Sequence, residues 1–391
     1  MWEAEKVRCV IYRGGTSKAV FLRENDLPQD PKVRDQVILS IYGSPDSRQI
    51  DGLGGADSLT SKLAIIGPSS RPDADVDYTF GQVSLTQALV DYKGNCGNIS
   101  SAVGPFAIDE GFVRAVEPMT YVRIFNTNTK KIIVAEVPVR EGKAISQGAY
   151  RIDGVPGTGA KITLNFLDSG GAVTGELLPT GNLKDSMTLA DGRKLSVSLV
   201  DSANPAVFFK AADLGFTGLE LPEMVNSDPA LLALMEEIRS IAAEMMGLAK
   251  REEATAKSPA VPKIAFVSPV QDYRTRDGRL IKAEDIDLVA RTMSMQKMHK
   301  AYAVTGGICT ATAAKLQGTV VYEVLSKGSR QSSLVRLGHP SGTLDFDISL
   351  SRTEKGTFSL EKAGVARTAR RIMEGYVYVP RKIVWGLGEE G

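Results

Sequence analysis

Gly94-Asn95-Cys96-Gly97-Asn98-Ile99-Ser100-Ser101-Ala102-Val103-Gly104 is the stretch around which the rest of the chain can be organised. A strand-like run, Val83 to Asp91, precedes it, and an apolar segment with the character of a buried helix, Ala102 to Phe112, follows it. Gly and Asn tolerate positive φ, so the backbone at Cys96 can turn sharply and point several N–H groups into one small space. With the positive end of the helix dipole, such a turn binds carboxylates and favours a thiolate. The alternative is a cysteine that only fills a tight turn.

Composition and charge favour a protein that acts on a small molecule. The 391 residues are 43% hydrophobic, which suggests two domains with sizeable cores. Lys and Arg number 47 against 46 Asp and Glu, so neither nucleic acid nor a membrane surface is indicated as a partner. Three scattered cysteines (Cys9, Cys96 and Cys309) do not make a disulfide framework, and the charged N-terminus lacks the apolar core of a signal peptide. We therefore expect a cytoplasmic protein.

Apolar spacing predicts a mixture of strands and helices. Strands are expected at 8–11, 19–22, 63–66, 76–80, 83–92, 194–200, 264–267, 319–324, 333–337, 343–350 and 365–379, and helices at 28–42, 102–112, 229–249, 283–302 and 311–316. Asp30 and Asp228 are predicted to cap two of these helices. Residues 119–179 mostly alternate like strands, with turns at Glu141-Gly142 and Asp153-Gly154.

The two halves of the chain repeat one another. Ala19–Leu27 matches Ala206–Leu214, Ser61–Pro68 matches Pro262–Pro269, and Cys96 before its helix matches Cys309 before its helix, at offsets of 187, 201 and 213. Three matches in the same order predict a duplicated domain. The expected domains are 1–185 and 186–375, with 376–391 as a last strand that can return to the first. Two equivalent helix N-termini facing each other would bind a small anion at the domain interface.

Several kinds of chemistry are disfavoured by the motifs that are missing. The chain has only two histidines, His299 and His339, and no HExxH or CxxC motif, so no metal is expected. Gly52-Leu53-Gly54-Gly55-Ala56-Asp57 is not the dinucleotide fingerprint, and neither GxxxxGK[ST] nor GxSxG occurs. We expect no cofactor.

Lys62, Cys96 and Cys309 remain as chemically active side chains amid Gly, Ser, Thr and Asn. A lysine and a cysteine in one anion-binding pocket can move a proton on a carbon next to a carboxylate, while fixed N–H donors stabilise the enolate. The competing interpretation of Lys62 is an exposed lysine at a strand start, and its repeat partner Lys263 favours a structural role in both halves. The turn 338–342 either contacts a ligand carboxylate or is a plain hairpin loop.

Four motifs together resemble the PrpF family: Arg13-Gly14-Gly15-Thr16-Ser17-Lys18, Asp51-Gly52-Leu53-Gly54-Gly55-Ala56-Asp57, Thr60-Ser61-Lys62 and Gly94-Asn95-Cys96-Gly97-Asn98. That family includes 2-methylaconitate cis–trans isomerase, 3-methylitaconate Δ-isomerase and 4-oxalomesaconate tautomerase. The resemblance implies an α+β, diaminopimelate-epimerase-like fold of two pseudo-symmetric domains, each a curled β-sheet or barrel around a central helix.

The resemblance also implies roles for individual residues. The catalytic pair of the family maps onto Lys62 and Cys96. Expected substrate-binding residues are Arg13, Thr16, Ser17, Ser58, Gly97, Asn98, Cys309, Thr310, His339 and Ser341. In the epimerases two opposed cysteines act together, but here Cys309 is followed by Thr310-Ala311-Thr312 rather than by their Gly-rich sequence. That departure weakens a two-cysteine racemase mechanism.

The resulting hypothesis is a cofactor-independent isomerase that moves an allylic proton in an unsaturated di- or tricarboxylate of the 3-methylitaconate/2,3-dimethylmaleate type. Alternatives are a 2-methylaconitate or aconitate isomerase, a 4-oxalomesaconate tautomerase, a two-cysteine amino-acid racemase, and a non-catalytic accessory binding protein. The sequence is also compatible with a homo-oligomer.

Overall fold

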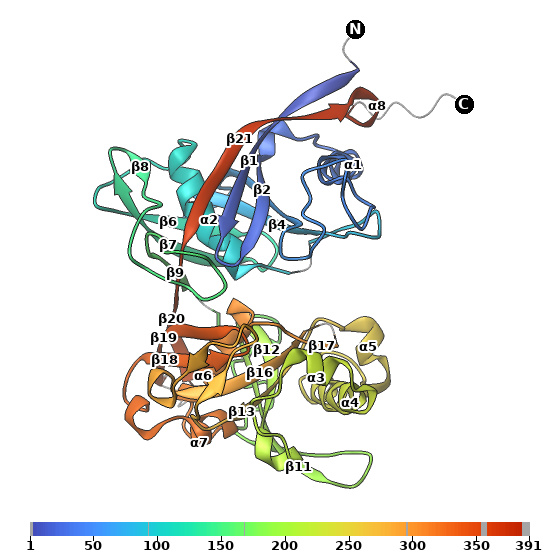
Figure 1. The fold of residues 1–391 in the computed structure, drawn as a ribbon, viewed down its shortest axis with the longest axis vertical. Helices are drawn as coiled ribbons and strands as arrows, with labels where there is room; N and C mark the ends of the chain where they lie inside the picture. Colours follow the sequence, from blue (N-terminus) through green and yellow to red (C-terminus); the bar gives the residue numbers. More distant parts are fainter. Residues whose placement is uncertain (1–2, 93, 168, 295, 353–357, 385–391) are drawn as a thin grey trace. The chain divides into compact units, whose positions relative to one another are not determined.

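The computed structural model describes residues 3–92, 94–167, 169–294, 296–352 and 358–384. The chain forms two compact units (Figure 1): unit 1 is Met1–Leu164 with Ala366–Gly391, and unit 2 is Asn165–Val365. The sequence places the corresponding divisions after residues 185 and 375. Part of the expected returning segment, 385–391, lies outside the described residues.

Unit 1 is a sheet with helices on both faces. Its elements are β1 (Ala4–Gly14), β2 (Ser17–Arg23), η1 (Glu24–Asp26), α1 (Pro31–Tyr42), β3 (Lys62–Pro68), β4 (Val76–Val83), β5 (Val90–Asp91), α2 (Gly97–Asp109), β6 (Met119–Asn126), β7 (Lys131–Arg140), β8 (Lys143–Ala144), β21 (Ala369–Pro380) and α8 (Arg381–Val384). Val20, Leu22 and Leu63 pack with α1, whereas Phe21 packs on Phe106 of α2. Alternate strand residues therefore face different helices.

Unit 2 repeats this plan. Its elements are β10 (Asp185–Thr188), β11 (Lys194–Ser202), β12 (Asn204–Lys210), η2 (Ala211–Leu214), α3 (Pro222–Asn226), α4 (Pro229–Met245), η3 (Arg251–Glu253), α5 (Ala254–Lys257), β13 (Lys263–Ser268), β14 (Tyr273–Arg274), β15 (Leu280–Ile281), η4 (Ala283–Asp285), β16 (Leu288–Ser294), β17 (Lys297–Met298), α6 (Val304–Lys315), α7 (Val320–Val324), η5 (Lys327–Ser329), β18 (Leu334–His339) and β19 (Gly342–Arg352). Two strands, β9 (Ile162–Phe166) and β20 (Phe358–Arg367), cross the divisions between the units. Figure 1 shows α2 against the strands of unit 1 and α6 against those of unit 2.

Strand register confirms the internal repeat. In unit 1, β2 and β3 are parallel and Ala19 lies opposite Lys62. In unit 2, β12 and β13 are parallel and Ala206 lies opposite Lys263, at the positions that the sequence matches predict. The flanking pairings also correspond, since β1–β2 and β11–β12 are both antiparallel.

The predicted equivalence of Cys96 and Cys309 is wrong. In α2 the first helical hydrogen bond runs from the Ser100 N–H to the Cys96 carbonyl, and in α6 it runs from the Gly307 N–H to the Ala303 carbonyl. Ala303 therefore has the N-cap position in α6 that Cys96 has in α2. Cys309 lies inside α6, fully buried, and is not placed before the helix.

Three predicted elements are also wrong. The expected helix 283–302 is mainly β16, a strand buried on both faces, where apolar residues do not alternate and mimic a helical pattern. The expected strand 319–324 is α7, because Thr319 accepts a hydrogen bond from the Tyr322 N–H and caps it. The expected strand at 83–92 is interrupted: only β5 remains after β4, and Ser84 closes a turn with Leu89.

Two helix caps are confirmed. Asp30 accepts hydrogen bonds from the Lys32 and Val33 N–H groups at the start of α1, and Asp228 does the same for Ala230 and Leu231 at the start of α4. No helix among the described residues is long and apolar enough to cross a membrane.

A buried carboxylate fixes the C-terminal end of α2. The side chain of Glu110 is 2% exposed and pairs with Arg8 of β1, with Arg23 of β2 at 2.6 Å and with Arg371 of β21 at 2.7 Å. Burial alone would raise the pKa of Glu110, but the three arginines outweigh it and hold the pKa at about 2.

We expect Glu110→Gln to lower the free energy of unfolding by about 2 kcal/mol at neutral pH, because three arginines lose a buried partner. A folded-state pKa below the ordinary value gives stability that is present above about pH 4.5 and is lost as the pH falls through about 2. Melting curves of wild type and variant should therefore converge over that range. Glu374→Gln is the control. Because Glu374 is 58% exposed, this substitution should lower the free energy of unfolding by less than about 0.5 kcal/mol. A melting-temperature gap that does not change with pH would contradict this role.

Candidate active site

Lys62 is the first residue of β3, and it is 8% exposed. Its Nζ donates a hydrogen bond to Gln82 Oε1 at 2.6 Å and lies 5.4 Å from the centre of the Phe80 ring. Both of these described partners are uncharged. The competing interpretation of an exposed lysine is wrong, because the side chain is buried against Gln82 and Phe80 of the neighbouring strand β4.

Gln82 is itself held in one orientation. Its amide nitrogen donates to the Ser61 carbonyl at 3.0 Å and to the Ser58 carbonyl at 3.2 Å, which turns its oxygen toward Lys62. Ser58 is exposed and takes part in this arrangement through its backbone. The Gly-rich loop that ends at Ser61 thus positions the amine through Gln82.

The register of β2 and β3 places Lys62 on the side of the sheet that α2 covers. Ala19 is two residues from Phe21, so the two side chains share a face, and Phe21 packs on Phe106 near the end of α2. At the other end of β2, the amide of Asn98 donates to Thr16 Oγ1 at 3.1 Å. Lys62, opposite Ala19, therefore lies beside the N-terminal half of α2.

The N-terminus of α2 offers backbone donors. The first N–H groups of a helix have no intrahelical acceptor, and the side chain of Cys96 does not cap them. The helix begins at Gly97 rather than near Ala102, and Gly97 and Asn98 have helical backbone instead of the expected left-handed turn. Polar residues fit this first turn because Ser100 and Ser101 donate to the Cys96 and Asn98 carbonyls. This end of the helix can bind a carboxylate.

Ser17 supplies a further polar group on the same face. It is two residues from Ala19 and 2% exposed, and its hydroxyl oxygen has no hydrogen-bond partner among the described residues. A buried hydroxyl without a partner is costly, which is typical of a group reserved for a ligand. Ser17 and the helix N-terminus thus provide donors near Lys62.

Cys96 is half-buried and lies within electrostatic range of Tyr78, a residue that the sequence did not single out. Tyr78 is fully buried, and burial followed by the charge of a Cys96 thiolate raises the pKa of the tyrosine well above its ordinary value. Tyr78 lies opposite Ile66, four residues along β3 from Lys62 and on the same face. Tyr78, which is near Cys96, and Lys62 therefore lie on the same face of the sheet.

Arg13 and Arg367 hold the loop beside Asn98. Arg13 Nη1 donates to the Gly15 and Thr368 carbonyls, both at 2.9 Å, and burial lowers the pKa of Arg13. Arg367 Nε donates to Asn98 Oδ1 at 3.1 Å. Gly15 has φ +51°, and a Cβ there would lie 2.1 Å from Asn98 Oδ1, so only glycine fits.

The remaining expected site residues lie in unit 2, and two of them are in its core. Cys309 donates from Sγ to the Val200 carbonyl at 3.2 Å, and burial raises the pKa of its thiol. Thr310 is bonded to the Gly306 carbonyl and to the Tyr302 hydroxyl. Both side chains are therefore engaged in hydrogen bonds within the core of unit 2.

His339 and Ser341 lie at the turn between β18 and β19. His339 is 3% exposed and its Nδ1 accepts from the Ser341 N–H at 3.2 Å. The Ser341 hydroxyl donates to the Lys300 carbonyl at 2.5 Å. Both residues thus support the hairpin in which the sequence places them.

Three residues of the site were missed: Gln82, Tyr78 and Arg367. Gln82 and Tyr78 contact the expected residues only through the pairing of β3 with β4. Arg367 reaches Asn98 from 269 residues away in the chain. Only the spacing of Gln82 from Tyr78, which alternates along one strand, was visible in the sequence.

Comparison with known proteins gives close matches over the whole chain. A family model described as PrpF protein matches residues 4–380. The 3-methylitaconate isomerase of Eubacterium barkeri is 54% identical over 383 residues, covering 97% of this chain and 99% of that protein. A crystal structure of methylitaconate-delta-isomerase superposes with a TM-score of 0.88 at 53% identity, covering 98% of both chains.

A more distant structure bears on the fold alone. A hydroxyproline epimerase from Agrobacterium vitis matches with a TM-score of 0.54 at 13% identity, covering 99% of this chain and 98% of that one. The predicted α+β epimerase-like fold is confirmed by this likeness.

Proposed function

The chain belongs to the PrpF family and is an isomerase, and we propose that it shifts an allylic proton in a small unsaturated dicarboxylate of the 3-methylitaconate/2,3-dimethylmaleate type. The observation that carries the proposal is the position of Lys62. Its amine lies beside the N-terminal half of α2, on the face where the Ser17 hydroxyl has no hydrogen-bond partner among the described residues. The proposed base Lys62, the N–H and hydroxyl groups that would bind a carboxylate, and the Cys96 thiol thus all belong to unit 1.

The mechanism we propose needs only these groups. Lys62 acts as the base and removes the allylic proton next to one carboxylate, and the electron pair delocalises into a dienolate. The N–H groups at the start of α2 and the Ser17 hydroxyl hold the carboxylate on which negative charge develops. Cys96 or the protonated Lys62 then returns a proton at the other end of the three-carbon system, and the double bond moves. Neither a metal nor a cofactor takes part in this proposal.

Proton NMR in D2O tests the reaction directly. With 3-methylitaconate, we expect deuterium in the newly formed methyl group of the product and, through reversal of proton removal, at the allylic C–H of the remaining substrate. The panel should include 2-methylaconitate, cis- and trans-aconitate and 4-oxalomesaconate, which are the alternative substrates. Exchange with only a geometric change would favour cis–trans isomerisation, and binding without any exchange would overturn the proposal in favour of an accessory binding protein.

The burial of Cys309 argues against the two-cysteine racemase. A racemase of that type needs a second thiol that can reach the stereocentre, whereas the Cys309 sulfur is fully buried and bonded to the Val200 carbonyl. We also propose a cytoplasmic location, which the three free cysteines support.

A further inference from the structure

Tyr42, the last residue of α1, is hydrogen-bonded to the backbone of Lys62. Its side chain is fully buried in the core on the α1 side of unit 1. The hydroxyl accepts from the Val20 N–H at 3.3 Å and donates to the Lys62 carbonyl. Burial raises the pKa of Tyr42 above its ordinary value, so the hydroxyl keeps the proton that it donates. One side chain thus joins β2 to the residue that begins β3.

Tyr42 reaches Lys62 from the face of the sheet opposite to the amine. Leu63, the next residue of β3, packs with α1, so the side chain of Lys62 points to the α2 side. The substrate is proposed to bind on that α2 side, where Ser17 and the helix N-terminus lie. Tyr42 therefore acts on the proposed reaction through Lys62, without touching the substrate.

The Gly-rich loop between Tyr42 and Lys62 ties the end of α1 in place. The Gly54 N–H donates to the Tyr42 carbonyl at 3.3 Å. A Cβ on Gly52 would lie 2.1 Å from the Gly43 nitrogen, so the loop backbone packs directly on the residue that follows Tyr42. The loop thus holds the tyrosine and leads straight into the strand that begins with the lysine.

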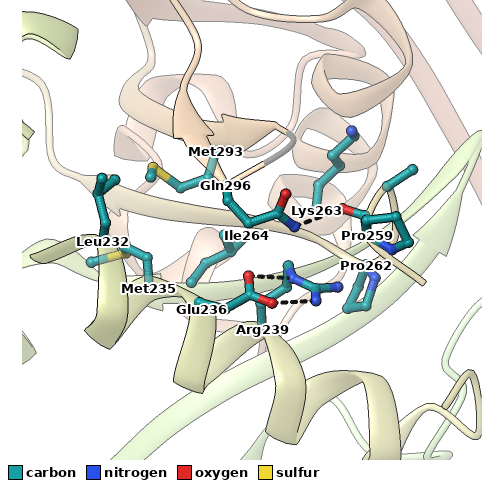
Figure 2. A pocket seen from close by; sticks show the side chains of 11 residues that line it. Leu232, Met235, Glu236, Arg239, Pro259, Pro262, Lys263, Ile264, Met293 and Gln296 are labelled. Atoms are coloured by element: carbon teal, nitrogen blue, oxygen red, sulfur yellow. Dashed lines mark hydrogen bonds and ion pairs between the residues drawn. The ribbon is translucent and has the colours of Figure 1, made fainter. Parts of the chain in front are cut away.

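The equivalent lysine of unit 2 lacks this arrangement. Lys263 begins the parallel strand β13, and its Nζ donates to Ser294 Oγ at 3.0 Å. Figure 2 shows its side chain directed away from Arg239 of α4. The helix α4 packs on the core strands of unit 2 as α1 does in unit 1, but it ends in Met245, which has no hydroxyl to bridge two backbone groups. The contact of Tyr42 thus belongs to the lysine with the proposed catalytic role.

We propose that Tyr42 is a positioning residue for the amine of Lys62, an inference that rests on the proposed function. A base must present its lone pair in line with the proton that it removes, and a misplacement of about 1 Å can cost roughly 10²-fold in rate. Gln82 accepts a hydrogen bond from the amine, and Tyr42 holds the backbone from which the side chain extends. Because both ends of the side chain are held, the amine keeps one position relative to the substrate.

Tyr42→Phe tests this role because it removes the hydroxyl and leaves the ring in the core. We expect kcat to fall about 10-fold while KM stays within about twofold. Tyr92→Phe is the matched control: it removes a 2.6 Å hydrogen bond from the Tyr92 hydroxyl to Asp35 of the same helix, a contact that does not involve Lys62. It should keep kcat within about twofold. Melting curves of both variants measure the loss of stability separately from the loss of rate.

The double variant Tyr42→Phe/Lys62→Met shows whether Tyr42 acts through the lysine. With no amine left to position, its turnover should equal that of Lys62→Met alone within about twofold. Additive losses, or equal kcat values for Tyr42→Phe and Tyr92→Phe, would overturn this inference and leave the proposed function intact. Full turnover by Lys62→Met would instead overturn the proposed function, and the inference with it.

A second variant covers the case in which Tyr42→Phe does not fold. Gln82→Met removes the hydrogen bond at the other end of the same side chain and enters the same comparison with Lys62→Met. We expect a lower kcat in Gln82→Met alone and no further loss in the double variant. An unchanged kcat, or an additive loss, would overturn the inference that the amine depends on being held at both ends.

Discussion

Replacing Lys62 with methionine is expected to lower kcat by about 10³-fold, within the range of roughly 10² to 10⁴ that general acid–base catalysis contributes. Methionine fills a similar volume but cannot accept a proton. It also leaves Gln82 Oε1 without the 2.6 Å hydrogen bond from Nζ, so circular dichroism and melting curves should accompany the kinetics. The same variant should lose exchange of the allylic proton in D2O.

The internal repeat supplies a matched control. Lys263→Met removes a lysine at the equivalent strand position, hydrogen-bonded to Ser294 instead of Gln82. It should keep kcat within about threefold, because Lys263 lies outside the proposed catalytic group in unit 1. If Lys62→Met kept most of the turnover while Cys96→Ser lost all of it, Lys62 would not be the base. Equal losses in the two lysine variants would indicate a shared structural role.

The repeat was visible in the sequence because the matching segments form buried strands, and packing restricts which residues such strands can contain. Ala19–Leu22 and Ala206–Phe209 both form buried strands with a parallel neighbour that starts in lysine. The helix 283–302 was mispredicted for the opposite reason. Six consecutive residues of β16, Leu288 to Met293, are buried, so the strand lacks the alternation that distinguishes strands from helices.

The site could be predicted only where chemistry is local in sequence. Lys62 and Cys96 lie within recognisable motifs, and the structure places both on the α2 side of unit 1. The orientation of Gln82 depends on the register of β3 and β4. The contact of Arg367 with Asn98 depends on a strand that comes from a distant part of the chain. No local sequence pattern encodes either feature. The mistaken match of Cys309 shows the same limit, because helix starts are set by backbone hydrogen bonds such as that of Gly307.

Replacing Cys96 with serine is expected to separate the two halves of the reaction. If Lys62 removes the proton and Cys96 returns one at the other end, Cys96→Ser should slow product formation by about 10²-fold and still allow washout of the allylic proton in D2O. Serine keeps the approximate size and hydrogen bonding of cysteine but is a much weaker acid than a thiol. NMR time courses that follow substrate deuteration and product formation together measure both steps.

Cys309→Ala is the matched control for that experiment, because Cys309 lies in the core of unit 2 and its sulfur donates only to a backbone carbonyl among the described contacts. It should cost about 1 kcal/mol of stability through a small cavity and leave kcat within about threefold. Equal losses in the two cysteine variants would favour a two-thiol mechanism. Loss of both washout and turnover in Cys96→Ser would make Cys96 part of proton removal, and full turnover would leave the return of the proton to Lys62 alone.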